Sequence, residues 1–457
     1  MLSRNPSNGT KPSHHQYRIA TPKEPSRTCF ERFWFEPARR YAGINVWQDR
    51  FAYSTGILTA FLFIAFFTPS SAYGSNAVDS YVTSVFQVLQ KHQAALPRLI
   101  APANATANAV MHGGAFYLAG DQGWVAEGDG RAGGLMVVRP LSASKPAVKG
   151  DVVWLAYTPR TYTEEEQQAR ELEGQGCLVI AFGPRLASGA PHFTHWIDSF
   201  TPPAADDNLT RMGNIISLWT ATGEVTASAS RAGKTLAFFQ SDSVESSNVR
   251  NHMYGILPPP GVWNSLAEKR SLAFHDGFPQ MAPIQPGVLS QAYISYVENM
   301  LQNIREWDLS SIMSVGQEMS RRAAEGHPAL LMLVGHMMPF AVDQNSKLFR
   351  YIDIQKQRNE VESQLHQGGY FVFIGYVGVY LDLLREVRQA GATAAWIVSS
   401  LPTEVHFSQW GDVVIDQQWR IGDCAVEAPG YDVRILPPSG IAQLFIYETL
   451  LRAAGAH

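Results

Sequence analysis

The 457-residue chain has few cysteines, little charge and no long run of basic residues in its body. Its three cysteines, Cys29, Cys177 and Cys424, lie far apart, which fits neither a disulfide framework nor a CxxC metal site. Charged residues make up 17% of the chain and the formal net charge is −4. Nucleic acid is therefore not an expected partner.

Motifs for cofactors and metals are also missing. No GxGxxG follows a predicted strand, which argues against a dehydrogenase with a dinucleotide-binding fold. The Gly-Lys-Thr at 233–235 lacks the glycine that a P-loop needs five residues earlier, where Ser228 stands. His192 and His195 are three residues apart, but no further grouping of Cys, His or carboxylates supports a metal site. The sequence predicts neither a metal nor a cofactor.

The N-terminal region contains one uncharged segment, residues 51–74, after a Ser-, Pro- and Arg-rich leader (1–50) that is expected to be disordered. Its apolar centre, 56–67, has the length of a signal-peptide core and is short for a spanning helix of about 20 residues. Small residues at 69–72 resemble a cleavage region. The alternatives are an uncleaved anchor with arginines on its cytoplasmic side and a buried core helix. Either membrane interpretation places the body outside the cytoplasm, exported or anchored; the alternative location is cytoplasmic.

The body, in a chain that is 46% hydrophobic, contains two halves with the same order of features. Each half opens with two helical segments, 78–96 (ended by Pro97) and 104–111 in the first half and 289–304 and 311–324 in the second. The expected strands are 115–119, 151–157, 177–182 and 196–198, and then 330–334, 370–376, 393–398 and 413–416. The expected later helices are 164–172, 214–220, 381–388 and 441–453.

This alternation of strands and helices predicts an α/β fold with two doubly wound parallel sheets of the flavodoxin type in tandem. The strands are continuous apolar runs, which indicates burial on both faces. Gly120 and Gly335 close the first strand of each half, and Asp198 and Asp416 close the fourth. The expected domains are 78–245 and 288–457, joined by a Pro-rich linker, 246–287.

Candidate ligand residues follow the first strand of the first half. Ligands of open α/β sheets collect at the carboxyl ends of the strands. Backbone N–H groups of Gly120, Asp121 and Gln122 could meet an anionic or polyhydroxy ligand, although the glycines of this stretch also suit a simple turn. In the Gly-rich patch that follows, Glu127 is a candidate general base. Arg131 could neutralise a ligand or pair with a neighbouring carboxylate.

Hydroxyl groups follow the second strand. Thr158, Thr161 and Thr163 precede a predicted helix, whose N-terminus could hold phosphate or sugar hydroxyls. The alternative is that Thr163 caps this helix and that the three glutamates at 164–166, which would repel phosphate, complement its dipole. In the second half, His336 is a candidate proton shuttle or a packed structural residue. Ser439 fits the N-cap of the last helix and could also contact a ligand.

Short motifs in both halves resemble the sugar isomerase (SIS) domain family. That family has a strand followed by G-x-G-H-S, a Glu pair and then R-A-G-G-L. Glu127 and residues 131–135 (RAGGL) match its latter part, and the Gly-His at 335–336 matches its loop. The family's later D-V-V-I-D, G-D-A and P-x-S pieces are matched in order by 412–416, 422–423 and 437–439. The resemblance spans about residues 78–454.

The resemblance implies a small-molecule partner, a sugar or sugar phosphate, and no cofactor. If the chain is an enzyme, the implied reaction is aldose–ketose isomerisation, with Glu127 moving the proton and His336 assisting at the ring or carbonyl oxygen. The alternative is a non-catalytic SIS module that serves as a ligand sensor or structural partner, because neither half carries the family's S-x-S-G-x-T loop. A homodimer is left open, and membrane contact is expected through the N-terminal segment only.

Overall fold

The computed structural model describes residues 70–186, 191, 193–203, 205–241, 244, 247, 251, 280–353, 361–376, 380–399, 411–420 and 422–456. All of them belong to the unit Thr55–His457. The predicted leader, most of the apolar segment 51–74 and most of the predicted linker lie outside these residues, so the predictions about them stay predictions. Within the described part, no helix is both long enough and apolar enough to cross a membrane.

The described strands form two five-stranded sheets in which every neighbouring pair is parallel. The strand order is β2-β1-β3-β4-β5 in the first sheet and β7-β6-β8-β9-β10 in the second, which is the same topology. This confirms the predicted α/β fold with two doubly wound sheets. The strands are β1 (Phe116–Gly120), β2 (Val138–Pro140), β3 (Val152–Ala156), β4 (Leu178–Gly183), β5 (Trp196–Asp198), β6 (Ala329–Leu333), β7 (Phe349–Asp353), β8 (Tyr370–Ile374), β9 (Thr393–Val398) and β10 (Val413–Asp416).

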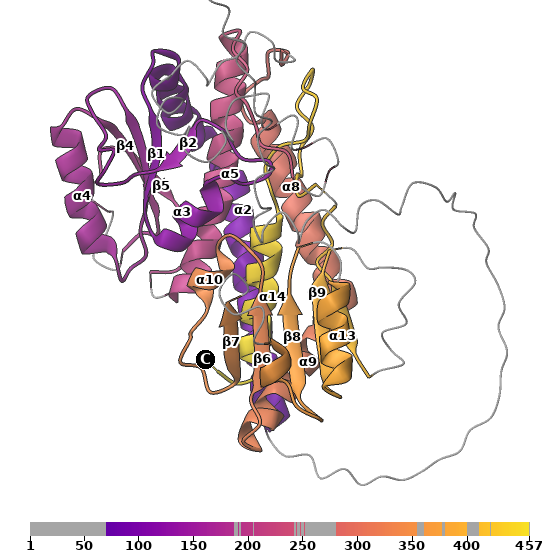
Figure 1. Ribbon diagram of the computed structural model, residues 1–457. Coiled ribbons are helices and arrows are strands. Elements are labelled where there is room, and N and C mark those ends of the chain that lie inside the picture. Colours follow the sequence, from indigo (N-terminus) through magenta and orange to yellow (C-terminus); the bar gives the residue numbers. More distant parts are fainter. Residues whose placement is uncertain are drawn as a thin grey trace, which may run out of the picture. The chain divides into compact units, whose positions relative to one another are not determined.

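Helices flank both sheets (Figure 1). They are α2 (Ser70–Met111), α3 (Gln122–Gly128), α4 (Tyr162–Gly174), α5 (Asp207–Arg231), α8 (Val288–Asn303), the π-helical η3 (Ile304–Asp308), α9 (Leu309–Ala324), α10 (Met338–Ala341), α12 (Val361–Gln364), α13 (Leu381–Gln389) and α14 (Ser439–Ala453). Helices α2, α5, α8 and α14 pack against one another. One hydrophobic cluster contains Val152 and Ile180 of the first sheet and Leu331 and Val372 of the second, so the halves share a core.

The backbone hydrogen bonds at the strand ends correct the predicted pairing of glycines. The Asp121 N–H donates to the Ala156 carbonyl (2.9 Å), and the Val334 N–H donates to the Ile374 carbonyl (2.8 Å). Asp121 and Val334 are therefore equivalent, and Gly335 corresponds to Gln122, not to Gly120. The halves match, but two residues out of the register that the glycines suggested.

The predicted pairing of acids is correct. Asp198 and Asp416 end β5 and β10, and each carboxylate accepts the N–H two residues later, at 2.8 Å in both halves. The accepting turn places Phe200 at φ 57° and Gln418 at φ 60°. Two non-glycine residues with positive φ at equivalent places are unusual, and they support duplication of one unit.

Two of the predicted helices are longer in the structure than the sequence indicated. Pro97 does not end the first helix: α2 is continuous over 42 residues and contains both Pro97 and Pro102. Its buried residues, Leu96 and Leu99 among them, pack against other elements, and tertiary packing outweighs the cost of about 3 kcal/mol for an internal proline. Helix α5 runs for 25 residues rather than the predicted 214–220. Its Thr220, Thr222 and Thr226 hydroxyls donate to carbonyls four residues earlier, so a Thr-rich stretch remains helical.

Candidate functional site

The connections of the first sheet diverge between β1 and β3, because β1 leads to β2 on one side and β3 leads through α4 to β4 on the other. Ligands of open parallel sheets bind in the crevice at the carboxyl ends of strands where connections diverge in this way. In this chain that edge consists of residues 120–122 after β1 and residues 158–161 after β3. The structure thus brings Gly120, Asp121, Gln122, Thr158 and Thr161 to one edge, as predicted.

Asp121 does not lie in an open loop. Its side chain caps α3 by accepting the Trp124 N–H at 3.0 Å. From α5, Arg211 donates from Nε and Nη2 to Oδ2 of Asp121, at 3.0 and 2.8 Å. The Asp121 carboxylate is therefore already neutralised by an ion pair with Arg211 that contains two hydrogen bonds. The Gln122 side chain donates to the Gly120 carbonyl at 3.1 Å.

The threonines after β3 form a tight turn into α4. The Thr158 N–H donates to Oγ1 of Thr161 at 3.1 Å, and the Thr161 N–H donates to the Thr158 carbonyl at 3.2 Å. Thr161 is the N-cap of α4, which corrects the prediction that Thr163 caps the helix; Thr163 lies within the first turn and is exposed. The Val377–Val379 loop, which follows β8 in the second half, lies outside the described residues.

Two buried polar atoms beside this turn have no hydrogen-bond partner among the described residues. They are Oγ1 of Thr158, a residue that is 1% exposed, and Oδ1 of Asn214, which is fully buried. Asn214 reaches the edge from α5, since its Nδ2 donates to the carbonyl of Tyr157 at 3.0 Å. Buried polar atoms are nearly always paired, so these two unpaired atoms at the end of one strand are candidates for hydrogen bonds to a ligand or to water.

The equivalent edge of the second half is bridged by a side chain. Gln443 of α14 donates to the Val334 carbonyl (3.0 Å) and to the Gly375 carbonyl (2.9 Å), so it spans the ends of β6 and β8. Oε1 of Gln443 is also buried without a hydrogen-bond partner among the described residues, so an unpaired amide oxygen occurs at both edges. The shorter Asn214 donates to one strand end only in the first half. The first-half edge, where no described side chain bridges the two strand ends in this way, is therefore the better candidate for a ligand site.

Acidic groups dominate the first-half edge. Glu164 and Glu165 lie in the first turn of α4, as predicted. Burial, the largest cause, raises the pKa of Glu165 to about 7, and the charges of Asp121 and Glu164 raise it further in the same direction. Asp121 is already paired with Arg211, whereas the exposed Glu164 and the half-buried Glu165 have no ion-pair partner among the described residues.

A second cluster lies at the other end of α3 and is buried. Arg131 Nη1 contacts Oε2 of Glu127 at 2.5 Å, and its Nη2 contacts Oδ2 of Asp423 at 3.1 Å and also donates to the Ser439 hydroxyl. Ser439 donates its own hydroxyl to Asp423 at 2.8 Å. Trp219 donates to Oε1 of Glu127 at 3.4 Å. This network joins side chains from the two halves of the chain.

The network explains three of the predicted site residues. Glu127 lies in α3 rather than in a loop and is fully buried. Ser439 is the first residue of α14, with Pro438 at the N-cap. Its hydroxyl therefore does not cap the helix but donates a hydrogen bond to Asp423. Arg131 pairs with Glu127, which was one of the predicted alternatives.

Burial changes the charge states in this network. It raises the pKa of Glu127 to about 7, while the Arg131 charge acts in the opposite direction. Burial, followed by the charge of Arg131, lowers the pKa of His336 to about 3, so its imidazole is neutral at neutral pH. The His336 ring bonds to the backbone of Ala126, and the backbone N–H of His336 donates to the Tyr376 hydroxyl at 3.1 Å. The two predicted catalytic residues therefore both lie at the short helix α3: Glu127 is part of it, and His336 contacts it.

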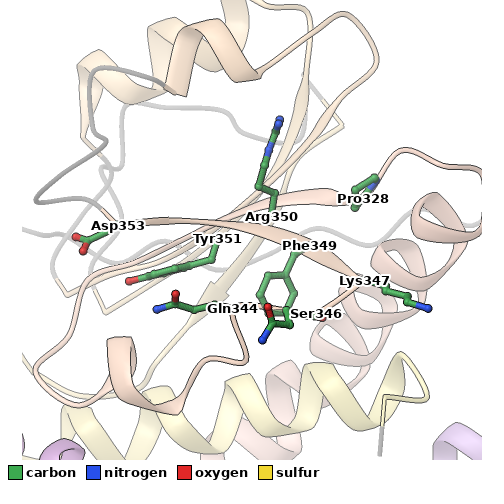
Figure 2. Close-up of a pocket in the computed structure, with 9 residues that line it drawn as sticks. Pro328, Gln344, Ser346, Lys347, Phe349, Arg350, Tyr351 and Asp353 are labelled. Atoms are coloured by element: carbon green, nitrogen blue, oxygen red, sulfur yellow. The ribbon is translucent and has the colours of Figure 1, made fainter.

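A cavity of about 720 Å³ lies elsewhere, along the edge strand β7. Figure 2 shows Tyr351 and Asp353 of β7 around it, together with Gln344 and Lys347 from the preceding loop. No residue predicted from the sequence lines this cavity. Since it follows an edge strand rather than a divergence of connections, it is a separate surface feature.

Sequence reasoning missed Arg211, Asn214, Trp219 and Asp423 as site residues. The first three lie on α5, which was predicted too short, and their contacts cross 57 to 92 positions in sequence. A signal for Asp423 existed in the Gly-Asp pair of the SIS-like motif. Within the described part, no three His, Cys, Asp or Glu side chains gather so as to hold a metal ion; His192 lies outside that part.

No protein-family model matches the chain, and no curated protein matches its sequence. Solved structures do match. One is the C-terminal domain of glucosamine-fructose-6-phosphate aminotransferase from Francisella tularensis, with 10% identity and a TM-score of 0.40 over 81% of this chain and 96% of that one. A candidate phosphosugar isomerase from Silicibacter pomeroyi has 10% identity and a TM-score of 0.43 over 84% and 97%.

A candidate phosphosugar isomerase from Clostridium difficile has 6% identity and a TM-score of 0.44, covering 82% of this chain and 91% of that one. Proteins described as phosphosugar isomerases thus recur among the matches. Because identities are near a tenth and TM-scores lie below 0.5, these matches do not assign a ligand or a reaction to this chain.

Proposed function

We propose that the chain is a binding protein for a sugar derivative and that its ligand site is the first-half crevice, at residues 120–122 and 158–161. The observation that carries the proposal is the pair of unpartnered buried atoms, Oγ1 of Thr158 and Oδ1 of Asn214. A hydroxyl can donate to one group and accept from another, so a polyhydroxy ligand suits an unpaired hydroxyl and an unpaired amide oxygen at one strand end.

An aromatic side chain beside Arg211 supports a sugar ring as the ligand. Phe340 is 46% exposed, and its carbonyl accepts from Nη1 of Arg211 at 3.1 Å. A Cβ at Gly123 would lie 3.1 Å from Cβ of Phe340, which places this residue at the start of α3. Exposed aromatic rings offer an apolar face to the C–H groups of a ligand while its hydroxyls bind elsewhere.

Isothermal titration of the full chain with free sugars, amino sugars and sugar phosphates tests this proposal. Thr158→Val removes the unpartnered hydroxyl at nearly constant volume and is expected to weaken binding by roughly tenfold. Thr83→Val, an exposed position on α2, is the matched control and should bind like the wild type. If no sugar of any class binds, or if Thr158→Val binds as tightly as the control, the proposed site is wrong.

A second candidate function is aldose–ketose isomerisation, favoured by the pKa of Glu127 near 7, which suits a general base at neutral pH. The full burial of Glu127 and its ion pair with Arg131 favour instead a structural role. Turnover assays on any sugar that binds decide between them. If Glu127→Gln abolishes turnover while binding persists, the chain is an isomerase; if no bound sugar turns over, binding alone is the function.

We also propose that the body lies outside the cytoplasm, exported or held by the segment 51–74. The uncharged segment and the preceding arginines are the support for this location. Protease treatment of intact cells tests it: the body should be cut without lysis. Protection of the body until the cells are lysed would favour the cytoplasmic alternative.

A further inference from the structure

The charges around the first-half crevice are unbalanced. The segments that bound it, 120–122 and 158–165, and the facing start of α5, 207–211, carry four carboxylates and two guanidinium groups. The carboxylates belong to Asp121, Glu164, Glu165 and Asp207. Both guanidinium groups already have carboxylate partners, since Arg211 pairs with Asp121 at 2.8 Å and Arg160 with Asp207 at 3.1 Å. This leaves no uncommitted cation on these segments.

A phosphate group would be poorly stabilised in this crevice. It would bring up to two further negative charges towards Glu164 and Glu165, and like charges repel most strongly where burial excludes water. Two backbone donors of the turn between β3 and α4 are also occupied, because the N–H groups of Thr158 and Thr161 both form hydrogen bonds within the turn. The donors that usually hold phosphate at a helix N-terminus are therefore partly occupied.

An ammonium group would meet the opposite situation. Glu165 is half-buried, lies near enough to Asp121 for their charges to interact, and has no ion-pair partner among the described residues. The unpartnered hydroxyl of Thr158, buried at the same edge, is an independent feature that accommodates a ligand hydroxyl or amine. A ligand with a positive charge and several hydroxyls would satisfy both groups.

We propose that the ligand of this crevice is a sugar derivative that bears an amine and no phosphate, with its ammonium group at Glu165 and a hydroxyl at Thr158. This inference rests on the proposed function, and it specifies the ligand's charge. This proposal also distinguishes the chain from proteins that bind phosphosugars, because the start of α4, where a phosphate would have to bind, carries the glutamates Glu164 and Glu165.

Titration of the full chain with four probes tests the inference: glucosamine, glucose, N-acetylglucosamine and glucosamine 6-phosphate. Glucosamine should bind about tenfold more tightly than glucose or N-acetylglucosamine, since a charge-assisted hydrogen bond is stronger than a neutral one. Glucosamine 6-phosphate should bind at least about tenfold more weakly than glucosamine. Glu165→Gln should remove the preference for the amine, so that glucosamine binds no more tightly than glucose.

Glu171→Gln is the matched control, because Glu171 is an exposed carboxylate further along the same helix, α4. Circular dichroism confirms that each variant is folded. Tighter binding of the phosphorylated probe, or equal binding of glucose and glucosamine, overturns the inference and leaves the proposed function intact. Failure of all four probes and of the wider sugar panel overturns the proposed function itself.

Discussion

Replacing Arg131 by Met should destabilise the protein strongly. Arg131 is 1% exposed and contacts Glu127 at 2.5 Å and Asp423 at 3.1 Å, and its guanidinium lies 6.0 Å from the centre of the Tyr376 ring. Methionine keeps most of the apolar volume but leaves two carboxylates buried without their cation. Breaking a buried ion pair in this way costs about 3–5 kcal/mol of unfolding free energy.

Urea unfolding, followed by circular dichroism and tryptophan fluorescence, measures this loss. The control is Arg321→Met, which removes an arginine with two carboxylate partners, Glu318 and Glu325, from the exposed face of α9. Surface pairs of this kind contribute little, so the control should resemble the wild type. A loss below about 1 kcal/mol for Arg131→Met, or a loss equal to that of the control, would refute the idea of a buried network.

A double variant separates the lost cation from lost packing. Glu127→Gln in the Arg131→Met background removes one of the two stranded charges and should recover part of the stability. Residues in direct contact typically show coupling of about 0.5–3 kcal/mol. Strictly additive effects of the two changes would mean that Arg131 does not stabilise the charge of Glu127.

Two further predictions concern Glu127 and its neighbour. The pKa of Glu127 is raised from 4.5 to about 7. The stability that this shift contributes is therefore complete below about pH 4.5 and is lost as the pH rises through 7. This loss in unfolding free energy is on the order of 3 kcal/mol. Glu127→Gln should flatten that part of the thermal stability profile, and an unchanged slope would contradict the assignment. Gly440→Ala should cost about 1–3 kcal/mol, because its Cβ would lie 2.4 Å from Oε1 of Glu127. Gly174→Ala, at an open position near the end of α4, should be neutral or stabilising by up to about 1 kcal/mol in the same urea experiment.

The central strands could be predicted because a strand that is buried on both faces consists of a continuous run of apolar residues. Among the central strands, β9 begins and ends as predicted and the others do so within one or two residues; the edge strands β5 and β10 also begin and end as predicted. The other two edge strands, β2 and β7, were missed, because the partly exposed Arg139 and the exposed Arg350 interrupt their apolar pattern.

The candidate site could be predicted only in part. Position along the chain and the rule of strand ends were enough to bring Asp121 and Thr158 to one edge. Nothing in a single sequence pairs Arg131 with Asp423, since their contact spans 292 positions and depends on how the halves pack. The same limit applies to Arg211, because which carboxylate it meets is decided by tertiary structure.

The tie between Arg131 and Asp423 has a consequence for the history of such a chain. Two copies of a unit that arose by duplication can at first be separated and still fold alone. Once a buried carboxylate of one copy depends on an arginine of the other, the two fragments are no longer equally self-sufficient: Arg131 keeps Glu127 as a partner within its own half, whereas Asp423, among the described residues, has its cation only from the other half. The copies keep the same topology, but the second has come to depend on the first, and a break in the connection between them would have to be repaired by reassembly.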